Sequence, residues 1–220
     1  SMGGILGRLY AQAGNVDKVH KLITVNTPHA GSEFADIILS HEEDVSELLK
    51  IMHDHFLNEN TDFSLGAIKD LSVGSKAIAD LNSYSCPDIP VHAIATHLAD
   101  NVNLGRLSGM LEVAGGISKN RGFLLNALGV LSGNLAHFLD DVSQYHPKSD
   151  FVVNIESQIG NRNSASIGGY TLIPGVMHIG STNNASVQDR IEYLLKGSVH
   201  SGDFIRSWFD PAPREFNESG

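Results

Sequence analysis

Val19-His20-Lys21-Leu22-Ile23-Thr24-Val25-Asn26, followed by Thr27-Pro28-His29-Ala30-Gly31-Ser32, is the stretch that decides the fold. Its first part is mostly apolar and β-branched, which predicts a short strand. Its second part contains Pro, Gly and Ser, which favour a turn and the start of a helix. A strand that turns into a helix is one βα unit, and such units build parallel sheets with helical cover.

The flanking segments repeat this alternation. Upstream, residues 2–13 predict a helix that ends at Gly14-Asn15. Downstream we expect helices within 33–83, strands at 89–96 and 151–155, a small strand or hairpin within 164–172, and an amphipathic helix at 184–196. The predicted class is therefore α/β, with few parallel strands and flanking helices. Three convincing strands are few for a parallel sheet, so the chain resembles the second half of a larger α/β domain.

Composition narrows the functional classes. The chain has 220 residues, a formal net charge of −10 and no dense cluster of Lys and Arg. Nucleic acids and anionic membranes require a basic surface, so we expect neither as a partner. No apolar run approaches the roughly 18 residues of a membrane span. Cys86 is the single cysteine, which excludes an intrachain disulfide and leaves the compartment undetermined.

The chain opens on Ser1-Met2-Gly3-Gly4, a serine on a glycine turn that runs into the first helix. This arrangement suits a nucleophile elbow, in which a tight turn exposes the serine oxygen and aims the next backbone N–H at an oxyanion. Two other interpretations remain open at this point. Ser1 could be a helix N-cap, or Ser-Met could be the remnant of a cleaved tag.

Several stretches together resemble the lipase and esterase branch of the α/β-hydrolase family. Ser1-Met2-Gly3-Gly4 with Arg8 is similar to its elbow and elbow helix, and Leu22 to Ser32 to the next strand and loop. Asp70-Leu71-Ser72-Val73-Gly74-Ser75 with Leu81-Asn82 is similar to a helix of the lid region. Ser149-Asp150-Phe151-Val152-Val153 with Ser157-Gln158 is similar to the segment that carries the acid, and Met177-His178 matches the position of the histidine.

The resemblance implies a serine ester hydrolase that acts on acyl esters or lipids without a metal or other cofactor. Ser1 is then the nucleophile, His178 the base, and Asp150 the carboxylate that orients His178, in the family's order of Ser, Asp and His. The Met2 backbone N–H is the expected oxyanion donor.

Other acids and histidines compete for these roles. Asp140, Asp141 and Glu156 are alternatives to Asp150, and His200 is the reserve candidate for the base. His53-Asp54-His55 offers too few ligands for a metal site, so we expect a solvated helix face there.

The lipase-like interpretation also assigns a substrate cleft and a domain plan. We expect residues 1–210 to form a single incomplete hydrolase domain, with lid inserts at about 33–86 and 98–148, and a loose tail at 211–220. The expected substrate-binding residues are His29, Met110, Leu111, Leu124 and Leu128.

The resemblance begins at the elbow, so the first half of the family's sheet and its second oxyanion donor are missing. We therefore weigh an alternative function, a catalytically incompetent module that self-associates or binds a partner through its exposed sheet edge. A longer chain, a truncated product or pairing with another copy would each account for the gap. An N-terminal-nucleophile hydrolase is a third option, but its antiparallel sandwich does not suit this alternation of strands and helices.

Overall fold

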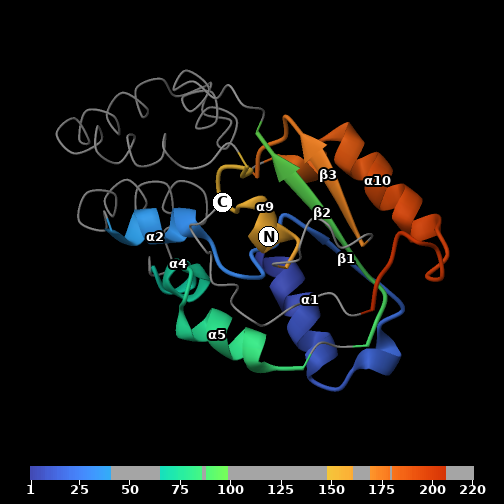
Figure 1. Cartoon of the computed structure of the whole chain (residues 1–220), viewed down its shortest axis with the longest axis horizontal. Helices are drawn as coiled ribbons and strands as arrows, with labels where there is room; N and C mark the ends of the chain where they lie inside the picture. Colours follow the sequence, from blue (N-terminus) through green and yellow to red (C-terminus); the bar gives the residue numbers. More distant parts are fainter. Residues whose placement is uncertain (41–64, 86–87, 99–147, 161–168, 179, 207–220) are drawn as a thin grey trace, which may run out of the picture.

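A computed structural model describes residues 1–40, 65–85, 88–98, 148–160, 169–178 and 180–206. Its centre is a parallel sheet of β1 (Leu22–Val25), β2 (Val91–His97) and β3 (Tyr170–Pro174), in the order β1-β2-β3 (Figure 1). Helices flank these strands, which confirms the α/β character predicted from the alternating pattern.

The strand register brings the three carboxyl ends to one edge of the sheet. Val25 pairs with Ile94, and Pro174 pairs with His97 at the end of β2. Because a tight hairpin cannot join two parallel strands, the chain leaves the sheet at this edge after each strand, and after β1 and β2 it crosses over to the next. In parallel α/β sheets, ligand sites form outside the carboxyl ends of the strands.

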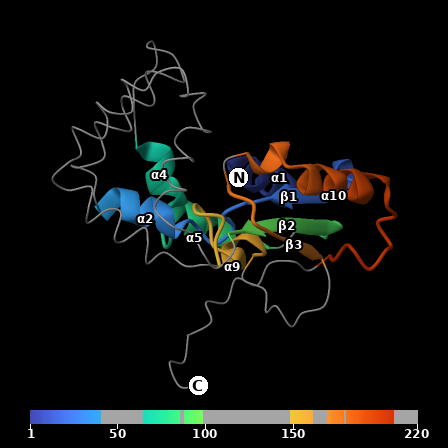
Figure 2. The same ribbon diagram turned by 90° about the horizontal axis from the view of Figure 1, so that it is seen from above.

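The alternation of side chains along the strands divides the core into two faces. On one face, Ile94 and Ile173 pack with Val187 and Leu194 of α10 (Ala185–Lys196). Both Figure 1 and Figure 2 show α10 running along the sheet beside the strands. On the other face, Val91 packs with Ala11 of α1 (Met2–Gln12).

The remaining helices lie around α1 and beyond the sheet. Ile5 of α1 packs on Ile78 and Leu81 of α5 (Lys76–Ser83). Both views place α2 (Glu33–Ser40) and α4 (Gly66–Leu71) beyond one end of the sheet, away from α10. The described chain also contains η1 (Val16–Lys18), α9 (Ile155–Gln158) and η3 (Ser181–Asn183).

Most predicted elements have their observed counterparts within a few residues. The helix at 2–13, the strands at 19–26 and 89–96 and the helix at 184–196 correspond to α1, β1, β2 and α10. The small strand expected within 164–172 is β3, displaced slightly toward the C-terminus. Of the helices expected within 33–83, the structure describes α2, α4 and α5.

The strand predicted at 151–155 is wrong. Phe151 to Val153 form bends, and α9 begins at Ile155. The Asp150 carboxylate accepts the backbone N–H groups of Val152 and Val153, which closes a tight turn in place of a strand. Phe151 has a φ of 87°, which an extended strand does not permit.

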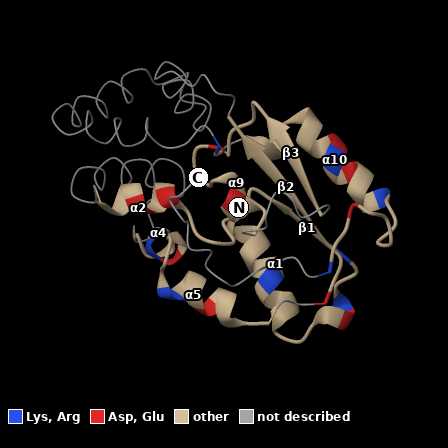
Figure 3. Cartoon of the chain, viewed as in Figure 1, with Lys and Arg blue, Asp and Glu red and all other residues tan. Residues whose placement is uncertain are grey.

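Several predictions lie outside the described residues. They concern Cys86, the motif His53-Asp54-His55, Asp140 and Asp141, residues 41–64 of the first insert, residues 99–147 of the second, and the tail at 211–220. Among the described residues, no helix combines the length and apolarity that a membrane crossing requires. Figure 3 shows basic and acidic residues on both α5 and α10, whereas α1 carries a single basic residue, Arg8.

Candidate active site

The segments that follow the three strands meet at the carboxyl edge of the sheet. At the end of β1, the Ser1 α-amine donates a hydrogen bond to the Val25 carbonyl at 2.7 Å. After β2, Leu98 N–H donates to the Ser149 carbonyl at 2.8 Å, which ties the Asp150 turn to this strand. The loop after β3 carries His178, so all three predicted catalytic residues lie at the edge where parallel sheets bind ligands.

Asp150 is fully buried in a tight turn of the chain. Its Oδ1 accepts Val152 N–H at 3.0 Å and Val153 N–H at 2.7 Å. Its own backbone N–H donates to the Val153 carbonyl at 3.2 Å. These bonds hold the carboxylate in one orientation and leave Oδ2 facing out of the turn toward His178.

His178 is joined to Asp150 twice. Its ring Nδ1 lies 2.7 Å from Asp150 Oδ2, and its backbone N–H donates to the Asp150 carbonyl at 2.9 Å. The carboxylate can only accept, so Nδ1 carries the hydrogen and Nε2 is the acceptor nitrogen of the neutral ring. The side chain is 13% exposed, whereas that of Asp150 is 0% exposed. A buried carboxylate thus orients the ring of a partly exposed histidine, as the predicted roles of Asp150 and His178 require.

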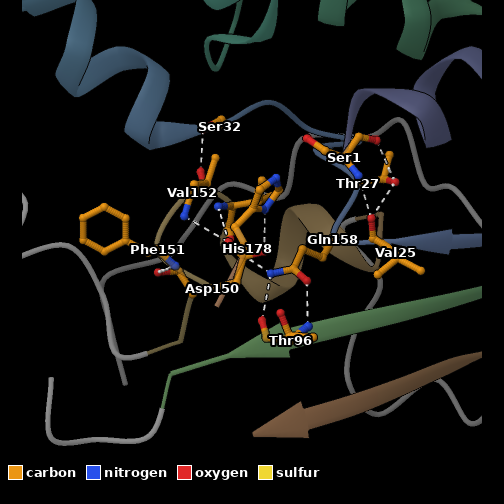
Figure 4. Close-up of polar contacts among 12 residues, drawn as sticks. Ser1, Val25, Thr27, Ser32, Thr96, Asp150, Phe151, Val152, Gln158 and His178 are labelled. Carbon is orange, nitrogen blue, oxygen red and sulfur yellow. Dashed lines mark hydrogen bonds and ion pairs between the residues drawn. The ribbon is translucent and has the colours of Figure 1, made fainter. Parts of the chain in front are cut away.

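Ser1 stands at the N-terminus of α1, and Figure 4 draws it with His178 and Asp150 in one view. Burial lowers the pKa of its α-amine, and the nearby charge of Asp150 opposes this effect. Ser1 occupies the N-cap position, but its side chain makes no capping hydrogen bond. Among the described residues, no hydrogen bond joins its hydroxyl to His178. Such contacts are often long before substrate binds.

The loop after β1 fixes Ser1 through Thr27. The Thr27 Oγ1 donates to the Ser1 carbonyl at 3.0 Å, and Thr27 itself is fully buried. A Cβ added to Gly4 would lie 2.0 Å from this Oγ1, whereas a Cβ added to Gly3 would meet nothing within 4 Å. Gly4 therefore permits the close approach of α1 to the loop.

Met2 is the first residue of α1, where backbone N–H groups lack a carbonyl acceptor within the helix. The partial positive charge of a helix N-terminus also favours an anion at this point. The position suits the predicted oxyanion donor, and that role stays a prediction. Met2 is 48% exposed.

Of the other candidate residues, the structure describes Glu156, His200 and His29. Glu156 is exposed in the first turn of α9, and His200 is exposed after α10. His29 is fully buried, and its proposed contact with substrate stays a prediction. Met110, Leu111, Leu124 and Leu128 lie outside the described residues.

The sequence predicted no functional role for two residues of the site. Thr27 binds the Ser1 backbone, and Gln158 binds the Asp150 turn. Both act through bonds to the main chain, which leave no spacing pattern in a sequence. Both residues stand in stretches that carry the family resemblance, which assigned no role to either.

Within the described ranges, no group of three or more His, Cys, Asp and Glu side chains could hold a metal ion. Comparison of the chain with known proteins gives no match to a family model, to a curated protein or to a solved structure.

Proposed function

We propose that this protein is a serine ester hydrolase with an α/β-hydrolase architecture, and that it transfers the acyl group of an ester to water. The observation that carries the proposal is the 2.7 Å contact between the buried Asp150 carboxylate and His178 Nδ1, at the edge of the sheet where Ser1 stands. In a triad, the aspartate sets the tautomer and orientation of the base, and a buried carboxylate held by two backbone N–H groups suits that role.

The proposed reaction has two halves. The Ser1 Oγ attacks the acyl carbon while His178 Nε2 accepts its proton, and the Met2 N–H stabilises the oxyanion that forms. The C–O bond to the alcohol then breaks, and the proton on His178 passes to the leaving oxygen. In the second half, His178 takes a proton from water as the water oxygen attacks the acyl carbon. The bond to Ser1 Oγ then breaks, His178 returns the proton to Oγ, and the acid product leaves.

The test is labelling with a fluorophosphonate probe, read by mass spectrometry of the modified peptide. We expect the probe on Ser1 in the folded chain, and none after Ser1→Ala. His178→Ala should slow labelling strongly, whereas the matched control His200→Ala should not. A folded chain that is never labelled at Ser1 contradicts the proposal.

A second candidate function, self-association without turnover, is favoured by an apolar stripe on α1. Met2, Leu6 and Tyr10 recur at helical spacing and are 48%, 58% and 49% exposed. In the described sheet, β1 pairs only with β2, so its other edge is unpaired. Sedimentation combined with a chromogenic ester assay separates the two functions. Association with no turnover favours the module, and turnover by a monomer favours the hydrolase.

A further inference from the structure

The side-chain amide of Gln158 connects β2 to the Asp150 turn. Gln158 is the last residue of α9 and is fully buried. Its Oε1 accepts Thr96 N–H at 2.8 Å, and its Nε2 donates to the Thr96 carbonyl at 2.9 Å and to the Val153 carbonyl at 2.7 Å. Both donors of the amide and its acceptor oxygen are therefore used.

The geometry of β1 explains why Thr96 needs this partner. Asn26 N–H donates to the Ile94 carbonyl, which is the last bond of β1 to β2. Asn26 has a φ of 51°, so the chain turns out of the sheet there. The N–H and C=O of Thr96, two residues further along β2, point toward the same side. The Gln158 amide takes the place that the next residue of β1 would have filled.

From Gln158 a short series of bonds leads to the base. Gln158 Nε2 binds the Val153 carbonyl, Val153 N–H binds Asp150 Oδ1, and Asp150 Oδ2 binds His178 Nδ1 (Figure 4). The turn between them includes Phe151, whose φ of 87° is rare for a residue with a side chain. Backbone in such a conformation persists only where the surroundings hold it.

We propose that Gln158 is a positioning residue, which fixes the Asp150 turn to the end of β2 and so keeps the Asp150 carboxylate on His178. The kinetic part of this inference rests on the proposed ester hydrolysis. The structural part, the Asp150–His178 hydrogen bond, can be observed without turnover.

The neighbouring residue provides a matched control. Ser157 lies in the same helix and is also buried, but its hydroxyl serves a different segment. It donates to the Gly31 carbonyl at 2.6 Å and accepts Ala30 N–H at 3.0 Å. Ser157→Ala thus removes buried hydrogen bonds of α9 without touching the Asp150 turn.

The experiment compares Gln158→Met, which keeps the chain length without the amide, with Ser157→Ala in the full chain. The readouts are kcat and KM for a short chromogenic ester, and the downfield proton NMR signal of His178 Nδ1–H bonded to Asp150. Gln158→Met should lower kcat by up to about 100-fold, the cost that a misplacement of 1 Å can reach, with KM unchanged. It should also broaden or remove the signal, which Ser157→Ala should retain.

A second measurement covers the case in which Gln158→Met does not fold. In the otherwise unchanged chain, Asp150→Asn should shift the side-chain amide protons of Gln158 and leave those of the exposed Gln188 in place. An unmoved Gln158 amide overturns the inference, as does a folded Gln158→Met chain that keeps both kcat and the His178 signal. If no ester is hydrolysed but the signal depends on Gln158, the positioning inference stands and the proposed function fails.

Discussion

Thr27 Oγ1 occupies the space next to Gly4, only 2.0 Å from where a Cβ of residue 4 would lie. The same oxygen donates to the Ser1 carbonyl, so the contact between α1 and the loop after β1 also fixes the proposed nucleophile. A side chain at position 4 must separate these two segments or displace Thr27.

We therefore expect Gly4→Ala to be disruptive and Gly3→Ala to be tolerated. Overpacking of this kind costs about 1–3 kcal/mol, and the displaced Ser1 should react more slowly with a fluorophosphonate. Thermal melting and the rate of labelling check both effects. Adding Thr27→Ala to Gly4→Ala should restore part of the stability, because it removes two of the three clashing atoms. Equal effects of the two alanines would contradict the close approach.

Asp150→Asn should keep the fold and abolish most of the activity. An asparagine can present its NH₂ to His178 and so favour the wrong ring tautomer, which lowers kcat by about 10⁴-fold in a triad. The measurement is hydrolysis of a chromogenic ester, with circular dichroism as the control for folding. Glu156→Gln, at an exposed position in α9, should change kcat little. A similar loss in both variants would argue against a specific role of Asp150.

Lys21 should contribute more to stability than an ordinary surface lysine. Its Nζ donates to the carbonyls of Leu194, Leu195 and Gly197 at the C-terminal end of α10, at 2.8–2.9 Å. A cation at this end of a helix also meets the negative end of the helix dipole. We expect Lys21→Met to lower the free energy of unfolding by about 1–2 kcal/mol.

The matched control for Lys21 is Lys76→Met. Lys76 pairs with Asp80 on the exposed face of α5, and its side chain is 87% exposed. Denaturant unfolding of both variants should show a clearly smaller loss for Lys76. Equal losses would mean that the three carbonyl contacts add nothing to stability.

The Arg190–Asp203 pair should make stability depend on pH in the acid range. The hydrogen bond from Arg190 holds the pKa of Asp203 below its ordinary value, assisted by the Ser201 hydroxyl. A lowered pKa means that the folded chain favours the charged form. The stabilisation is therefore present above about pH 4 and disappears as the pH falls through the lowered pKa.

The test is the difference in melting temperature between the parent chain and Asp203→Asn across this range. At pH 6 the variant should melt roughly 1–3 °C lower, as for a partly exposed ion pair. The difference should shrink toward zero as the pH falls through the lowered pKa of Asp203. A difference that stays constant with pH would rule out the charge of Asp203 as its source.

The sequence predicted the parts of the fold that depend on periodicity. β1, β2, α1 and α10 have strong patterns of apolar residues, because each buries one face or both. The segment 151–155 has the apolar composition of a strand, but the Asp150 side chain binds the backbone that a strand would need. A side-chain bond of this kind is invisible to periodicity.

For the site, the family resemblance and the chain order of Ser1, Asp150 and His178 were sufficient to propose these three residues. The 2.7 Å contact between Asp150 and His178 favours this pair over the alternatives Glu156 and His200. The supporting residues could not be predicted in the same way. Thr27 and Gln158 act through main-chain groups, and their roles depend on where β1 ends in space.

The contacts around the short helix α9 span very different separations along the chain. Asp150 and His178 are 28 positions apart, and Gln158 lies between them, whereas Ser157 reaches across 126 positions to Gly31. Closing the shorter loop costs less chain entropy. We therefore expect the Asp150–His178 contact to form at a lower cost in chain entropy than the docking of the N-terminal segment, in which the proposed nucleophile lies.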